Sequence, residues 1–286
     1  MTQACSIRTG YPAARALRCT GHWLAALLLG LLLLLALSGC ASGAAGRSAG
    51  AGVEPVTEFD ESPQRKRARI RLELALGYFE KNQVKIALDE VKQSLAADPN
   101  FVEAHVLRGL IFMHLQDDRL TQESFERALQ INPRHPDALH NYGWFQCQSG
   151  RHAEAVELFN RALAVPAYAG QARTLMASGL CLTRMGQLAQ AEANFARSYE
   201  LDPGNPITAY NLANLLHRRA EDQRAQFIIR RLNNSELANA ETLWLGIRIE
   251  RRLRNTEAMA QLAQQLGRRY PQSGQWSAHQ RGAFDE

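Results

Sequence analysis

Cys147 and Cys181 are the two residues in the body of the chain whose side chains could form a covalent bond with each other. They are 34 residues apart, a spacing that recurs along the chain and places them on helices that pack side by side near an inner surface. A disulfide requires Cα atoms within about 7 Å. The alternative is a pair of buried free thiols, because cysteine often serves as a small core residue. We favour the disulfide, and the sequence leaves both states open.

The remaining reactive side chains do not predict a catalytic or metal centre. The chain has no glycine-rich phosphate loop and no His-Glu-x-x-His. Its 8 histidines are scattered, whereas a metal shell needs His, Cys or carboxylate ligands at spacings that close around the ion. We therefore expect no enzyme activity, no cofactor and no metal.

A third cysteine, Cys40, follows a segment with the features of a secretion signal. Three arginines and no acidic residue precede an apolar run at residues 23–37, which is too short for a membrane span of about 20 residues. The run ends in Leu37-Ser38-Gly39-Cys40, which resembles a bacterial lipobox. The resemblance implies a lipoprotein signal peptide at residues 1–39 and a lipid on Cys40. Ala41 implies sorting to the outer membrane. An ordinary signal peptide or signal anchor is the alternative.

The segment after Cys40 is predicted to be a flexible tether, residues 40–64. It is rich in Ala, Gly and Ser and then acidic, without helical periodicity. No later apolar run is long enough for a span, so we expect a chain that is anchored to a membrane from its periplasmic side without crossing it. Loss of the signal lowers the formal charge from +5 to about +2 (5 − 3), which gives no reason to expect nucleic-acid binding.

Residues from about 65 onward repeat with a period of 34. Pro99 and Pro133 are 34 residues apart, and Pro203 lies 70 residues farther on, which is twice 34 plus two. Two sets of residues keep the same period. The large apolar set is Val91, Phe125, Phe159 and Phe195, and the small set is Ala75, Gly109, Gly143, Gly179 and Ala213. The two extra residues fall near residues 166–170, as expected for a loop insertion.

This period and these residue types are typical of tetratricopeptide repeats, in which two antiparallel helices form each unit. Small residues let the two helices approach closely, and the prolines end the second helix. We predict an all-α fold, a right-handed superhelical solenoid of about six helix-turn-helix repeats. The repeats are expected at 68–101, 102–135, 136–171, 172–205, 206–239 and 240–273, within a body at 65–273 that is followed by a C-terminal tail at 274–286. A generic helical bundle is the alternative.

The first helices of such repeats line a concave groove, which is the predicted binding site for a partner. An apolar stripe flanked by asparagines suits a partner helix or an extended peptide, because amides can bond to a peptide backbone. Leu76 and Leu180 share this register but can equally be core residues. A basic cluster, Arg218, Arg219, Arg224, Arg230 and Arg231, is interpreted as a solvated face, and contact with an acidic partner or with lipid headgroups is the alternative. The predicted groove residues are Phe79, Leu110, Met113, Asn141, Trp144, Met176, Arg184, Tyr210, Asn211 and Asn214, and His217 is expected on the same surface.

The lipobox followed by six repeats resembles the type IV pilus biogenesis and stability proteins, the PilF/PilW pilotin family. The motifs on which this resemblance rests are Asn141-Tyr142-Gly143-Trp144-Phe145-Gln146-Cys147, Arg161-Ala162-Leu163-Ala164, Pro166-Ala167-Tyr168 and Gly179-Leu180-Cys181. The resemblance covers the whole mature body, less closely in its last repeat. It implies an outer-membrane lipoprotein that helps the pilus secretin to reach the outer membrane and to multimerise. The secretin is therefore the expected partner, and we expect the chain to be monomeric.

Two other functions are considered. One is a lipoprotein adaptor for peptidoglycan enzymes or for outer-membrane assembly machinery. The other is an enzyme with a repeat domain, which is disfavoured because no region outside the repeats is long enough for a catalytic domain. Loss of surface pili and of twitching motility on deletion would favour the pilotin, and septation or permeability defects with normal pili would favour the adaptor.

Overall fold

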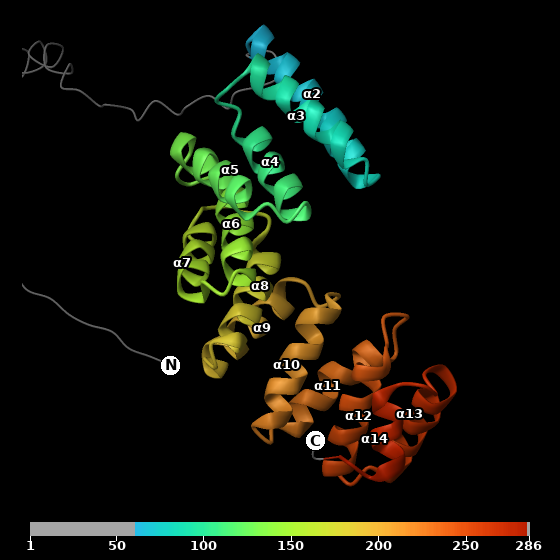
Figure 1. Cartoon of the computed structure of the whole chain (residues 1–286). Helices are drawn as coiled ribbons and strands as arrows, with labels where there is room; N and C mark the ends of the chain where they lie inside the picture. Colours follow the sequence, from blue (N-terminus) through green and yellow to red (C-terminus); the bar gives the residue numbers. More distant parts are fainter. Residues whose placement is uncertain (1–60, 285–286) are drawn as a thin grey trace, which may run out of the picture. The chain divides into compact units, whose positions relative to one another are not determined.

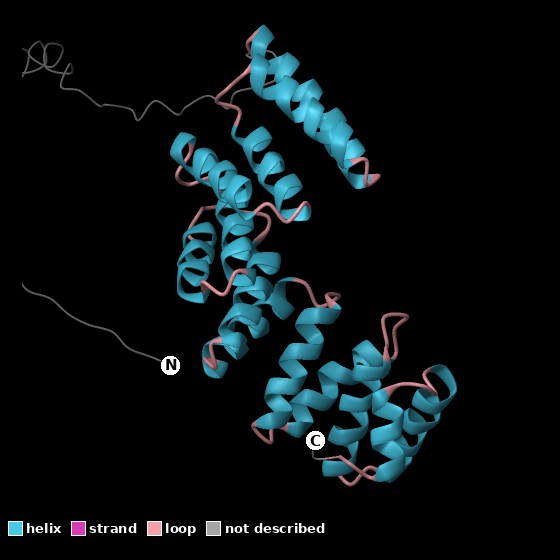
Figure 2. Ribbon diagram, viewed as in Figure 1, coloured by secondary structure: helices cyan, strands magenta, loops and turns pink. Residues whose placement is uncertain are grey.

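The computed structural model describes residues 61–284, and within them every regular element is a helix (Figures 1 and 2). The predicted signal peptide, Cys40 and most of the predicted tether lie outside the described residues. Thirteen helices follow one another as antiparallel pairs with a final single helix. The first helices of the pairs are α2 (Pro63–Glu80), α4 (Val102–His114), α6 (Pro136–Gln148), α8 (Gln171–Arg184), α10 (Pro206–Arg218) and α12 (Ala240–Arg252). The second helices are α3 (Val84–Ala97), α5 (Asp118–Ile131), α7 (His152–Leu163), α9 (Leu188–Leu201), α11 (Asp222–Asn233) and α13 (Thr256–Arg269), and α14 (Gly274–Arg281) ends the series.

The six pairs confirm the predicted all-α solenoid of tetratricopeptide repeats. Each pair falls within one predicted repeat, except that α2 begins five residues before the predicted repeat at 68–101 and α8 begins one residue before the predicted repeat at 172–205. Ser62 caps α2 by accepting a hydrogen bond from the Arg65 backbone N–H at 3.1 Å, and Pro63 occupies the first turn, where its missing N–H costs nothing. The helix therefore starts two residues inside the predicted tether.

Glycines in three first helices allow close contact with the second helix of the same pair. Each glycine lies under a fully buried phenylalanine ring: Gly109 under Phe125, Gly143 under Phe159 and Gly179 under Phe195. A Cβ added to Gly143 would lie 2.8 Å from Cε1 of Phe159, which is closer than atoms can pack. The predicted role of these small residues, close approach of the paired helices, is what the structure shows.

The turn inside every pair contains one residue in the left-handed backbone region. Two of these residues are glycines, Gly150 with φ of 79° and Gly186 with φ of 75°. The other four carry side chains, and the clearest example is Ala220 with φ of 62°. A residue with a Cβ pays a steric cost in this conformation, so these turns hold their geometry against the local preference of the chain.

The C-terminal segment contains a helix that covers the last pair. The predicted tail, 274–286, includes α14, which packs on α12 and α13. Trp276 lies so close to Gly267 that a Cβ there would be 2.8 Å from its ring. This helix therefore shields the apolar side of the sixth repeat from water, as the end of a solenoid requires. Among residues 61–284, no helix combines the length and apolar character that crossing a bilayer demands.

Candidate partner-binding face

First helices of neighbouring pairs lie side by side and form one face of the solenoid, here called the first-helix face. The adjacent helices are α2 and α4, α4 and α6, α6 and α8, and α10 and α12. Between the fourth and fifth pairs the packing runs through α9, which contacts α10. This face is where the predicted groove residues should lie.

The ten residues predicted to line the groove lie on first helices, and none of them is buried. Arg184 is exposed and the other nine are half-buried, namely Phe79, Leu110, Met113, Asn141, Trp144, Met176, Tyr210, Asn211 and Asn214. Half-burial means that each side chain packs against the core on one side and keeps a solvent-facing surface on the other. Of the two ambiguous leucines, Leu76 is 42% exposed and Leu180 is half-buried, so neither is a simple core residue. The prediction for His217 was wrong, because this side chain is only 2% exposed and bonds to the buried Asp222.

The apolar members of the set are fixed by contacts within the solenoid. The Phe79 ring on α2 meets the His114 ring on α4 edge to face, with centroids 5.7 Å apart. Trp144 packs against the buried cluster that contains both cysteines. Because their positions are already held, these side chains would lose little conformational freedom when a partner covers them.

The asparagines differ in how much hydrogen-bonding capacity they keep. Asn211 donates from its Nδ2 to the Ile207 carbonyl at 2.8 Å on its own helix. The side chains of Asn141 and Asn214 have no hydrogen-bond partner among the described residues. These two amides are the free donors and acceptors that an extended peptide backbone would need.

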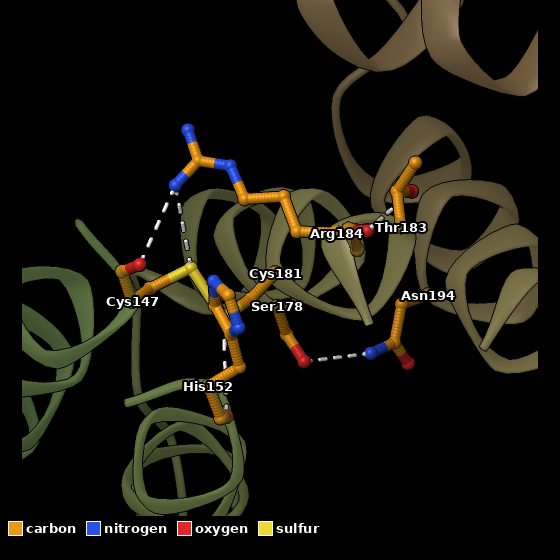
Figure 3. The surroundings of a disulfide bond; sticks show 8 residues. Cys147, His152, Ser178, Cys181, Thr183, Arg184 and Asn194 are labelled. Atoms are coloured by element: carbon orange, nitrogen blue, oxygen red, sulfur yellow. Dashed lines mark hydrogen bonds between the residues drawn. A yellow bond between two sulfur atoms is a disulfide. The ribbon is translucent and has the colours of Figure 1, made fainter. Parts of the chain in front are cut away.

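The structure links α6 and α8 through the two cysteines (Figure 3). Cys147 and Cys181 are joined by a disulfide with a Cα–Cα distance of 5.9 Å, and both side chains are fully buried. The bond therefore lies beneath the first-helix face and not on its surface. It fixes the third and fourth repeats relative to each other at the centre of that face.

Arg184 has an intramolecular role that the sequence did not reveal. Its Nη1 donates to the Cys147 carbonyl at 3.4 Å and lies 3.9 Å from the Cys147 Sγ (Figure 3). Cys147 is in the last turn of α6, where a cation is favoured by the helix dipole. Arg184 thus helps to hold α8 against α6, in addition to offering its exposed surface to a partner.

His152 was not singled out from the sequence, yet its imidazole lies beside the disulfide. The ligand atoms of Cys147, His152 and Cys181 all lie within 4.8 Å of one another. Zinc binds thiolates, and sulfurs that are bonded to each other are not thiolates, so the disulfide-bonded state lacks two ligands of such a set.

The sequence also contains one Gly-x-Ser-x-Gly pattern at residues 46–50, in the predicted tether and outside the described residues.

His140 forms a buried polar cluster behind the face. Its Nδ1 lies 2.9 Å from the Thr174 hydroxyl on α8, which is also 3.1 Å from the Tyr168 hydroxyl in the loop before α8. Burial lowers the pKa of His140 to about 3, with a smaller contribution from the nearby Arg173. The imidazole is therefore neutral at physiological pH and joins two repeats by a hydrogen bond without charge.

Comparisons with known proteins agree with this architecture. Residues 121–179 and 172–205 match two models described as tetratricopeptide repeat. The type IV pilus assembly protein PilF of Pseudomonas aeruginosa is 28% identical over 231 residues, which cover 79% of this chain and 92% of PilF.

Two solved structures extend the similarity to the fold. The structure of Pseudomonas aeruginosa PilF superposes with a TM-score of 0.72 at 26% identity, over 77% of this chain and 100% of that chain. PilW, described as a widely conserved type IV pilus biogenesis factor, has a TM-score of 0.65 at 29% identity, over 74% of this chain and 97% of that chain. Since sequence and structure point to the same relatives, this chain is a tetratricopeptide-repeat protein homologous to the type IV pilus biogenesis proteins PilF and PilW.

Proposed function

We propose that this chain is an outer-membrane lipoprotein scaffold that binds the type IV pilus secretin and promotes its localisation and multimerisation. The homology to PilF and PilW supports a role in pilus assembly. The observation that carries the proposal is the first-helix face, where half-buried apolar side chains are accompanied by the two unpartnered amides of Asn141 and Asn214. Such a surface suits the binding of a protein segment.

The chemistry of the face fits a segment that is apolar on one side and has accessible backbone. Trp144 and Met176 would supply apolar contact area at the centre of the face. Asn141 and Asn214 would bond to backbone groups of the segment, which fixes its direction and register. The disulfide between α6 and α8 keeps this central part of the face rigid, so that less entropy is lost on binding.

Lipidation of Cys40 completes the proposal. The lipobox-like Leu37-Ser38-Gly39-Cys40 supports it, and residues 40–62 would then be the tether between the bilayer and α2. The anchor would concentrate a monomeric scaffold at the membrane in which the secretin assembles. The test of this part is a Cys40→Ala variant, which keeps the repeats and removes the acceptor thiol.

The experiment is co-purification of the secretin with the detergent-extracted protein. We expect wild type to recover the secretin, and the Cys40→Ala variant to leave its multimers reduced or misplaced. A Trp144→Ala/Asn214→Ala variant should lose recovery. A matched control is Phe227→Ala, which removes an aromatic ring that is 72% exposed on the second helix α11, away from the first-helix face.

The outcomes separate the proposal from its alternative. Equal recovery with wild type and the face variant would refute the assignment of the first-helix face. Absence of the secretin from every sample, together with normal pili and a septation or permeability defect in a deletion strain, would replace the pilotin by an envelope adaptor.

A further inference from the structure

A basic pocket lies where α10 and α12 come together, at the C-terminal end of the first-helix face. It has a volume of about 190 Å³ and is lined by His217, Arg248, Arg251, Arg252 and Phe284. His217 comes from the last turn of α10, the three arginines come from α12, and Phe284 follows α14. Three guanidinium groups around one small recess create a strong positive potential, because solvent screens charges less in a recess than on a flat surface.

Two walls of the pocket are held by contacts inside the protein. Arg252 donates from Nη1 to the His217 carbonyl at 2.7 Å and lies 3.5 Å from the Asp222 carboxylate, which also bonds to His217 Nδ1. The Arg251 guanidinium lies over the Phe284 ring at 4.2 Å from its centroid. These contacts orient the two arginines before any ligand arrives.

Arg248 differs from its neighbours because its charge is not matched. Its Nε atom is buried and has no hydrogen-bond partner, and its side chain makes no ion pair with any described residue. A buried donor without a partner is unfavourable, because it has lost its hydrogen bonds to water and has gained none. The pocket is therefore lined by a guanidinium group that is neither ion-paired nor fully hydrogen-bonded within the described part of the protein.

Three members of the nearby basic cluster already have an ion-pair partner. Arg219 pairs with Glu192 at 3.0 Å, Arg230 pairs with Glu250 at 2.6 Å, and Arg224 pairs with Glu221. The other two, Arg218 and Arg231, are exposed to solvent. Arg248 differs from all five because it is half-buried, lines a pocket and has no ion pair among the described residues.

We propose that this pocket binds a carboxylate of an acidic segment in the protein partner, with Arg248 as its main donor. The proposal rests on the proposed function, because the pocket continues the face that we assign to the partner. A guanidinium presents two parallel N–H groups that match the two oxygens of a carboxylate. Asp222 already compensates Arg252, and Arg251 is engaged by other contacts, including the Phe284 ring. Arg248 is then the one guanidinium of the pocket without a partner among the described residues, and a single carboxylate matches it better than a phosphate dianion or a charged lipid headgroup.

The first experiment follows the Arg248 Nε–Hε signal by NMR while glutarate is added to the full protein. We expect a saturable shift with glutarate and none with its neutral diamide at the same concentration. Arg248→Gln should weaken binding about tenfold and Arg248→Lys somewhat less, because lysine keeps the charge and loses the planar fork. Arg219→Gln is the matched control and should bind within about twofold of wild type.

Arg248→Gln should fold normally, because Arg248 has no partner among the described residues to lose. An unmoved Arg248 signal would overturn the proposal. It would also be overturned by a shift seen with anionic lipid vesicles but not with glutarate. If glutarate binds only to the Asp285→Asn/Glu286→Gln variant and not to wild type, the pocket is occupied by the chain's own Asp285 and Glu286. That result would also exclude a partner site.

Secretin co-purification with the same variants separates this proposal from the proposed function. If wild type recovers the secretin but glutarate does not bind, the pocket proposal fails and the pilotin function survives. If glutarate binds at Arg248 and no secretin is recovered, the pocket is a carboxylate site and the assignment of the secretin as its partner fails.

Discussion

Acidification should destabilise the protein through His140. This histidine is 6% exposed, and its Nδ1 lies 2.9 Å from the Thr174 hydroxyl in the next repeat. Burial lowers its pKa from the ordinary 6.5 of histidine to about 3. The unfolded chain therefore binds a proton below about pH 6.5 that the folded chain takes up only near pH 3. As a result, the free energy of unfolding falls as the pH falls through this window.

The magnitude follows from the two pKa values. At pH 8 neither state is protonated and His140 has no effect. At pH 5 the unfolded state is about 97% protonated and the folded state is almost entirely neutral, so the loss is about 2 kcal/mol. For a body of this size that corresponds to a decrease in Tm of roughly 4 to 8 °C.

The assay is urea unfolding at pH 8 and pH 5, compared between wild type and His140→Asn. Asparagine keeps a polar nitrogen near the position of Nδ1 and does not titrate. His105 and His217, whose pKa values burial also lowers, contribute equally to both proteins and cancel in the difference. We expect wild type to lose about 2 kcal/mol more than the variant. Equal losses, or an NMR titration of His140 near pH 6, would refute this reasoning.

Three further predictions concern the repeats. Gly143→Ala should destabilise the protein by about 1 to 2 kcal/mol, because the clash with a buried ring outweighs the gain in helix propensity, as thermal unfolding would measure. Ala220→Gly should stabilise it by about 0.5 to 1 kcal/mol in the same assay by relieving a left-handed φ, and a loss would contradict the turn assignment. Intact-protein mass before and after reduction should reveal the disulfide as a gain of two hydrogens. Replacing Cys147 and Cys181 by serine should cost about 4 kcal/mol for the closed loop of 34 residues, and an unchanged unfolding midpoint would refute the crosslink.

The repeat architecture was predictable because its physical cause is local and periodic. A glycine opposite a phenylalanine recurs at one spacing in three hairpins, and this pairing brings their two helices together, as Gly143 and Phe159 illustrate. The exposure of the first-helix face was predictable for the same reason. Once the register is known, each position in the repeat determines whether a side chain points to the core or to the face.

The disulfide between two repeats could be anticipated because its cysteines keep the repeat period, but other contacts between repeats could not. Arg184 reaches back to the end of α6, and Arg248 lines a pocket where α10, α12 and the segment after α14 meet. No spacing in the sequence marks these contacts. The basic cluster is exposed, as expected of a solvated face. Its ion pairs were not predictable, since the glutamates that neutralise Arg219 and Arg230 lie 27 and 20 residues away along the chain.

The disulfide has a mechanical consequence. When a solenoid is pulled from its ends, its hairpins can peel away one after another, because each repeat contacts only its neighbours. A covalent link between residues 147 and 181, whose sequence separation is 34, withholds the chain between them from that extension, or roughly 110 Å of extended chain at about 3.4 Å per residue. Under tension the middle of this molecule would behave as an inextensible block between two segments that can still unravel.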